Sequence, residues 1–284
     1  ADFVGMASAA VSYASAALER MPGRQLLVPH IAKTGGTAVI SMLRSVSPPL
    51  NLSGMGTGRP LDLRSDVVIL HLPDSLPRVL RGAARAVAIL AVVRDPVERV
   101  LSEFLFMRGR HASAFVPLTK SLDKPNVSWE EWAAYPKARN FQLAYLRGYG
   151  MFSHVTTRRD WEAWVEEMAQ VPVVLLRMEA INSLLPAILE YGFPGRVVRQ
   201  RTPVGRWGRG FGVSAANASR LSAKTLVPLP NQSEREAIRR LNWLDEQLFQ
   251  LASNHTAAYA SLLLNDYSVG TDEPPRIIST TPFH

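Results

Sequence analysis

RQLLVPHIAKTGGTAVISMLRSV, residues 24–46, is the stretch that indicates the fold. Its first part, residues 24–31, is a short apolar run that ends near two glycines, as a buried strand does. Its last part, residues 37–46, has apolar residues at the spacing of one helix face. The stretch therefore predicts a strand, a tight glycine loop and a helix in direct succession.

Three more apolar runs have the length and composition of strands, and they lie at residues 66–72, 85–93 and 171–178. None of them alternates between apolar and polar residues, and helical sequence separates them. Buried strands joined by helices indicate a parallel sheet that is covered on both faces. We therefore expect an α/β fold with a P-loop-like parallel sheet flanked by helices on both faces.

Helical patterns fill most of the remaining chain. We expect helices at residues 1–20, 73–84, 97–109, 128–150, 160–170, 180–192 and 233–264. Residues 47–60 are rich in proline and glycine and predict a loop. The whole of residues 1–265 is expected to form one domain, with a Gly/Arg-rich loop at 201–220 and a poorly ordered tail at 266–284.

The composition is that of an ordinary globular protein, with 284 residues, 47% of them hydrophobic and 20% charged. The absence of cysteine excludes disulfides, thiolate metal sites and a cysteine nucleophile. A net charge of +8 favours anionic partners. The basic residues form no block of the kind that binds nucleic acid, so we expect no nucleic-acid partner.

The compartment is indicated by glycosylation sequons of the form Asn-x-Ser/Thr, at Asn51, Asn126, Asn217, Asn231 and Asn254. Their number favours the lumen of the Golgi and a glycoprotein, whereas the missing cysteines favour the cytoplasm. No apolar run is long enough to span a bilayer, so membrane attachment would need an anchor outside this chain.

The glycine loop has the features of an anion site, because a helix start presents unpaired amides and the positive end of the helix dipole. A Walker A loop places its lysine after the glycines. Here Lys33 precedes Gly35 and Gly36, so that pattern fails, and the dinucleotide pattern G-x-G-x-x-G is also absent.

The order of strand, HIAKTGGT and helix resembles the 5′-phosphosulfate loop of sulfotransferases that use 3′-phosphoadenosine 5′-phosphosulfate (PAPS). It is particularly similar to that of the heparan sulfate 6-O-sulfotransferases and more distantly similar to that of the uronyl 2-O-sulfotransferases. VVRDPVERVLSEF, residues 92–104, resembles that family's 3′-phosphate segment. Weaker similarities follow in the same order at residues 140–148, 176–193 and 239–252, so the resemblance extends from about residue 24 to 265.

The resemblance implies a role for each residue of the loop. Lys33 would contact the sulfate and the phosphate oxygen of the leaving group, where negative charge grows in the transition state. Thr34, Gly35, Gly36 and Thr37 would supply amide and hydroxyl donors to the 5′-phosphate. A simple capping turn at the helix start is a structural role that is compatible with this function.

The second motif would hold the 3′-phosphate through Arg94, whose guanidinium offers a bidentate fork, and through the Ser102 hydroxyl. Its other polar residues have structural explanations. Arg99 and Glu103 are expected to form an i,i+4 ion pair. Asp95 is expected to cap the following helix, whose first residue would be Pro96.

The resemblance implies that His71, at the carboxyl end of the second predicted strand, is the base that takes the acceptor's proton. His30 is its rival, interpreted as a structural or orienting residue, and Asp74 offers a carboxylate alternative. Asn140 and Gln142 are expected to contact the acceptor or to order the site.

The implied reaction is an in-line displacement that moves the sulfuryl group from PAPS to an acceptor hydroxyl, with the 3′,5′-bisphosphate (PAP) as product and no metal. We expect a carbohydrate acceptor. Two alternatives remain at this stage. One is an ATP-dependent kinase, which needs a magnesium-holding carboxylate such as Asp66 or Asp95, and the other is a catalytically silent module that binds polyanions.

Overall fold

A computed structural model of the chain describes residues 12–32, 34–54, 60–70, 75–82, 86–110, 129–149, 154–199 and 230–265. The predicted Gly/Arg-rich loop and the predicted tail lie outside these ranges. Of the predicted N-terminal helix, residues 12–19 are described and are helical.

The core of the protein is a five-stranded sheet in which all strands are parallel. In spatial order the strands are β3 (Leu52–Gly54), β4 (Val67–Leu70), β1 (Gln25–Pro29), β5 (Val87–Val93) and β6 (Val173–Arg177). The four predicted strands are all present, and β1 is central. The α/β architecture with a parallel sheet is therefore confirmed.

Two short pairings were not expected from the sequence. β3 lies inside residues 47–60, which we predicted to be a loop, and its Leu52 is in register with Val67 of β4. An antiparallel ribbon also joins β2 (Val46–Ser47) to β7 (Val197–Val198). The prediction of a loop was wrong at β3 because pairing with the neighbouring strand, rather than local propensity, forms so short an element.

Most helices agree with the periodic patterns. They are α2 (Gly36–Arg44), α3 (Ser75–Gly82), α4 (Pro96–Arg110), α8 (Arg158–Gln170) and α9 (Ile181–Gly192). A 3₁₀ turn, η2 (Met178–Ala180), links β6 to α9. None of the helices in the described ranges combines the length and the hydropathy needed to cross a membrane.

Two predicted helices are each interrupted. Residues 128–150 form α6 (Trp129–Ala134), the 3₁₀ turn η1 (Pro136–Ala138) and α7 (Phe141–Leu146). Pro136 cannot donate the hydrogen bond that would continue α6, and Asn140 adopts a left-handed backbone conformation with φ of 52° before α7 begins. The single helix predicted here was therefore wrong.

The helix predicted at 233–264 divides at Asn242 into α12 (Gln232–Leu241) and α13 (Trp243–Asn265). The Asn242 side chain donates to the carbonyl oxygen of Ile238 at 3.0 Å, while its Oδ1 accepts from the backbone N–H of Asn140 at 2.9 Å. Bonds of this kind compete with the continuation of a helix, and they explain the break.

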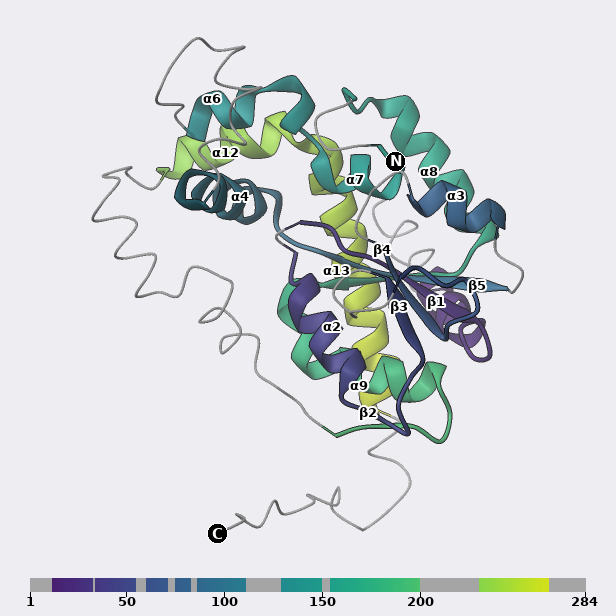
Figure 1. The fold of residues 1–284 in the computed structure, drawn as a ribbon. Helices are drawn as coiled ribbons and strands as arrows, with labels where there is room; N and C mark the ends of the chain where they lie inside the picture. Colours follow the sequence, from purple (N-terminus) through teal and green to yellow (C-terminus); the bar gives the residue numbers. More distant parts are fainter. Residues whose placement is uncertain are drawn as a thin grey trace.

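Helices cover both faces of the sheet (Figure 1). In β1, Leu26 and Val28 point into a core formed with α2 and α9, whereas Leu27 points into a core formed with α3, α7 and α8. α13 passes beside the edge strand β6 and contributes side chains to both cores. A third apolar cluster joins α4, α6 and α12. The carboxyl ends of β1, β5 and β6 therefore meet at one edge of a well-supported sheet.

Candidate functional site

The loop after β1 leads directly into α2, and Gly35 is the N-cap residue of that helix. Gly35 has φ of 89°, a conformation that favours glycine, and its carbonyl oxygen accepts from the N–H groups of Ala38 and Val39. A glycine cap supplies no side-chain acceptor to the first-turn amides. This helix start therefore has the chemistry of an anion site.

Both glycines are also required by packing within the protein. A Cβ atom on Gly35 would lie 2.8 Å from Cδ1 of Ile181 and 3.0 Å from Cγ of Met178. A Cβ atom on Gly36 would lie 2.0 Å from Cδ2 of the His30 ring. The loop after β1 is thus packed against the segment that follows β6, and His30 lies beside the start of α2.

The threonines of the motif have different surroundings. Thr34 is 1% exposed and its hydroxyl donates to the carbonyl oxygen of Ile31 at 3.0 Å, so this hydroxyl closes the loop. Thr37 is exposed on the first turn of α2. Neither threonine is the N-cap residue of α2, in contrast to the capping role considered from the sequence. Lys33 lies outside the described residues.

The proposed base, His71, and the alternative carboxylate, Asp74, also lie outside the described residues. Leu70, which precedes His71, ends β4 in register with Pro29, and its carbonyl oxygen accepts from the backbone N–H of His30 at 2.7 Å. The described part of β4 therefore ends beside the backbone of His30, a residue that is itself half-buried.

Arg94 follows β5 directly, at the same edge of the sheet as the loop after the neighbouring strand β1. Its side chain is 20% exposed and approaches a carboxylate oxygen of Glu98 at 3.7 Å. Burial lowers the pKa of Arg94, and the nearby carboxylates of Glu98, Glu179 and Asp95 oppose that shift. Arg94 remains a full cation at neutral pH.

Arg94, Glu98 and Ser102 follow one another at intervals of four residues, Arg94 just before α4 and the other two within it. Glu98 is therefore the middle one of the three, between the two residues expected to hold a 3′-phosphate. Ser102 is half-buried. Glu98 also pairs with Arg235 of α12, so one carboxylate is shared by two guanidinium groups. The side chains of Arg94, Glu98 and Arg235 together carry a net charge of +1.

The expected capping and ion pair of the second motif are present. Oδ1 of Asp95 accepts from the backbone N–H groups of Val97 and Glu98 at 2.9 and 3.0 Å, and Pro96 is the first residue of α4. Arg99 is fully buried and lies 2.6 Å from a carboxylate oxygen of Glu103. These residues hold the start of α4 in place.

Asn140 and Gln142 are buried and bind backbone groups. Oδ1 of Asn140 accepts from the N–H groups of Leu244 and Asp245 at the start of α13. The Gln142 amide exchanges two hydrogen bonds of 2.9 Å with the backbone of Arg94. These contacts give both residues a structural role within the described chain, where Asn140 is 4% exposed and Gln142 is fully buried.

The described residues bring three strand ends together. The loop after β1 touches Met178 and Ile181, which follow β6, while Glu179 lies near Arg94, which follows β5. Sequence reasoning missed the two acidic residues, Glu98 and Glu179. Glu179 could have been found, because it follows a predicted strand and parallel strands bring their carboxyl ends to one edge.

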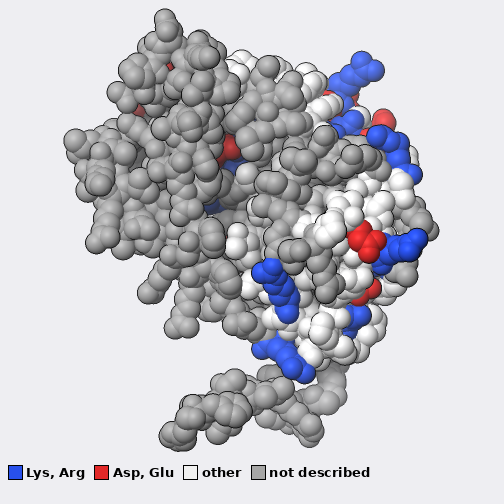
Figure 2. All heavy atoms as spheres, viewed as in Figure 1, with Lys and Arg blue, Asp and Glu red and all other residues white. Residues whose placement is uncertain are grey.

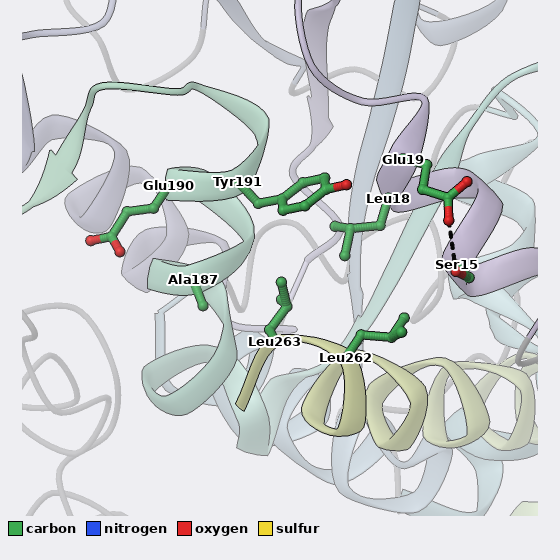
Figure 3. A pocket seen from close by; sticks show the side chains of 8 residues that line it. All are labelled: Ser15, Leu18, Glu19, Ala187, Glu190, Tyr191, Leu262 and Leu263. Carbon is green, nitrogen blue, oxygen red and sulfur yellow. Dashed lines mark hydrogen bonds between the residues drawn. The ribbon is translucent and has the colours of Figure 1, made fainter. Parts of the chain in front are cut away.

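A separate cavity of about 400 Å³ lies away from this edge, between residues 12–19, α9 and α13 (Figure 3). Its lining includes the apolar side chains of Leu18, Ala187, Leu262 and Leu263 and also Glu190. No residue predicted to bind the nucleotide or the acceptor lines this cavity.

The described arginines do not form one continuous patch on the face drawn in Figure 2, where basic side chains lie in separate groups and several adjoin acidic ones. The described residues also contain no cluster of three or more side chains suited to hold a metal ion. The sequence matches no model of a known protein family, and no curated protein is significantly similar to it.

Proposed function

We propose that the protein is a sulfotransferase that moves the sulfuryl group of PAPS to an acceptor hydroxyl. One observation carries the proposal: a glycine-capped helix start after β1 lies at the same sheet edge as Arg94, which follows the adjacent strand β5. A nucleotide with phosphates at both its 5′ and 3′ positions needs two such anion sites side by side. We also assign the fold to the P-loop-like class that sulfotransferases use.

The candidate site residues that the structure describes each have a role in this proposal. The first-turn amides of α2, including that of Thr37, hold the 5′-phosphate, and Arg94 and Ser102 hold the 3′-phosphate. The buried hydroxyl of Thr34 keeps the loop closed. The fixed amides need no reorganisation as charge develops on the leaving phosphate, which is the condition for effective electrostatic catalysis.

The chemical step is a single displacement. The acceptor oxygen attacks sulfur, the bond between sulfur and the 5′-phosphate oxygen breaks, and its electron pair leaves with the phosphate. His71 takes the acceptor's proton, and Lys33 offsets the charge on the leaving oxygen. Both assignments come from the resemblance of the motifs, since these two residues lie outside the described ranges.

The geometry gives less support to a kinase. Asp66 immediately precedes β4, which puts it at the amino edge of the sheet, where it accepts from Asn51 and pairs with Arg196. Asp95 uses one oxygen for the cap of α4 and pairs through the other with Arg239 at 2.8 Å. Neither carboxylate is placed to hold magnesium on a nucleotide.

A carbohydrate acceptor and a lumenal compartment remain parts of the proposal. The basic net charge suits an anionic sugar polymer. Three of the sequon residues, Asn51, Asn231 and Asn254, are described, and all three are exposed. Exposure is what glycosylation requires, although Asn231 also uses its side chain as the N-cap of α12.

Calorimetry with two nucleotides tests the nucleotide assignment. Adenosine 3′,5′-bisphosphate should bind more tightly than ADP, because only the former carries the 3′-phosphate that Arg94 recognises. Tighter binding of ADP would refute the proposal.

Incubation with labelled PAPS and a panel of polysaccharide hydroxyl acceptors tests transfer. Binding of sulfated polysaccharide without any transfer would favour the silent polyanion-binding module.

A further inference from the structure

We propose that Gln142, which has no exposed surface, is a positioning residue that fixes Arg94 and thereby sets the preference for nucleotides with a 3′-phosphate. This inference rests on the proposed function. It adds a determinant of specificity that does not itself touch the nucleotide, and it gives a specific target, the backbone of Arg94, to the ordering role that the sequence suggested for Gln142.

The contact between the two residues is reciprocal. Oε1 of Gln142 accepts from the backbone N–H of Arg94 at 2.9 Å, and Nε2 of Gln142 donates to the backbone carbonyl oxygen of Arg94, also at 2.9 Å. The side-chain amide thus pairs with the backbone N–H and carbonyl of one residue, as a neighbouring strand would. Arg94 is the first residue after β5, where the pairing of the strand with β6 ends at Val93. Gln142 extends the support of the backbone by one residue.

Gln142 is itself held firmly. Its backbone N–H donates to Oδ2 of Asp245 at 3.1 Å, and the N–H of Leu143 donates to Oδ1 of the same carboxylate at 3.0 Å. Asp245 is fully buried and lies 3.9 Å from Nε of Arg99. The start of α7 is therefore anchored to both α13 and α4.

The consequence for recognition follows from the geometry of arginine. A guanidinium binds phosphate strongly only when both of its donors meet two oxygens, and this depends on where the Arg94 backbone lies. The helix start at Gly35 is built from another segment and has no contact with Gln142 among the hydrogen bonds of the described residues. Loss of the Gln142 clamp should therefore weaken the 3′-phosphate contact and spare the 5′-phosphate contact.

Gln142→Met tests the inference because it keeps the length of the side chain and removes both hydrogen bonds. The dissociation constants of adenosine 3′,5′-bisphosphate and adenosine 5′-monophosphate are measured by calorimetry, and their ratio is compared with that of the wild type. We expect the preference for the bisphosphate to fall about ten-fold, which corresponds to one or two buried hydrogen bonds. Binding of the monophosphate should change little.

Gln25→Met is the matched control. Gln25 is also a buried glutamine, and its Nε2 donates to the carbonyl oxygens of Leu63 and Ser65 at 2.8 and 2.7 Å, at the opposite edge of the sheet. This variant should lose thermal stability and keep the wild-type preference. If Gln142→Met does not fold, Gln142→Asn keeps a neutral side-chain amide, is one methylene too short to make both bonds to the Arg94 backbone, and should likewise reduce the preference.

The outcomes separate the inference from the proposed function. An unchanged preference in a folded Gln142 variant would overturn the inference, and so would an equal loss of preference in Gln25→Met, since both variants would then act through general stability. A wild-type protein that does not distinguish the two nucleotides would refute the proposed 3′-phosphate site itself.

Discussion

Gly35 shows how a single residue meets two requirements of the loop after β1, a left-handed backbone and close packing against Ile181 and Met178. Gly35→Ala should destabilise the protein by about 2 to 4 kcal/mol, since a strained φ and a steric conflict add together. Gly23→Ala is the control, because Gly23 has φ of 73° and an added Cβ would meet no other atom within 4 Å. Gly23→Ala should lower the free energy of unfolding, measured by urea denaturation, by only about 1 kcal/mol. Equal losses would show that packing at Gly35 contributes nothing.

Glu98 is the residue whose removal should improve binding. Its carboxylate lies 3.7 Å from Arg94 and would repel a 3′-phosphate at that position. Glu98→Gln should therefore tighten the binding of adenosine 3′,5′-bisphosphate by a few-fold, a modest gain because Glu98 is partly exposed to solvent. Binding of adenosine 5′-monophosphate should stay the same.

Arg94→Ala provides the opposite comparison for the same measurement. It should weaken the binding of the bisphosphate by at least about ten-fold, the usual cost of losing a charge-assisted contact to phosphate. Tighter binding in both variants, or no change in either, would mean that the 3′-phosphate is held elsewhere.

Around Arg94, the sequence allowed local interactions to be predicted but not long-range ones. Asp95, Arg99 and Glu103 could be assigned because their interactions are local, within four positions along one helix. The clamp between Gln142 and Arg94 joins residues 48 positions apart. Such a pairing is set by tertiary structure and leaves no periodic signal in the chain.

The element α8 begins with a capping box, in which Thr157 and Asp160 satisfy each other's first-turn groups. Asp160 also accepts from the hydroxyl of Tyr149 at 2.5 Å and contacts Nε2 of His154 at 3.2 Å. Burial alone would raise the pKa of Asp160, but hydrogen bonds from Tyr149, Thr157 and His154 outweigh it and lower the pKa to about 2.

A lowered carboxyl pKa means that this stabilisation is complete above about pH 4 and is lost as the pH falls toward 2. Asp160→Asn should therefore lower the free energy of unfolding by about 1 to 2 kcal/mol at pH 7, and the difference from the wild type should shrink below pH 4. Glu162→Gln, which removes an exposed ion pair with Arg158, should have little effect at either pH. A constant difference across the acid range would exclude Asp160 as its source.

The breaks between helices were the elements least accessible from sequence. Asn140 and Asn242 each interrupt a pattern that is otherwise typical of a continuous helix. The Asn242 side chain accepts from the N–H of Asn140, just before α7, and the Asn140 side chain accepts from the N–H of Leu244 in α13. Because the two asparagines lie 102 positions apart, neither break can be predicted from its own surroundings. The strands, by contrast, were predictable because apolar runs without alternation are typical of a sheet buried on both faces.

At the scale of the whole molecule, α13 contributes side chains to both cores, and one residue of this helix, His255, is fully buried. The His255 ring stacks on Tyr13 with centroids 5.4 Å apart and meets the edge of Tyr259 at 6.1 Å. Among the described residues neither ring nitrogen has a hydrogen-bond partner. Burial lowers the pKa of His255 from 6.5 to about 4.

The lowered pKa of His255 makes the free energy of unfolding depend on pH. The unfolded chain binds a proton at His255 below about pH 6.5 and the folded chain only below about 4, so stability falls as the pH decreases between these values, by up to about 3 kcal/mol. His255→Phe keeps the aromatic packing and should remove this part of the decline in urea denaturation. An identical acid profile in wild type and variant would contradict the assignment. The effect of Asp160 lies at lower pH and is separable.

The central claim is that two neighbouring strand ends hold the two phosphate groups of one nucleotide. A crystal structure with adenosine 3′,5′-bisphosphate tests it most directly. The account predicts the 5′-phosphate on the amides of Gly36 and Thr37 at the start of α2, and the 3′-phosphate within hydrogen-bond distance of Arg94 and Ser102. A nucleotide bound at any other place, or with its phosphates away from both strand ends, would contradict the account.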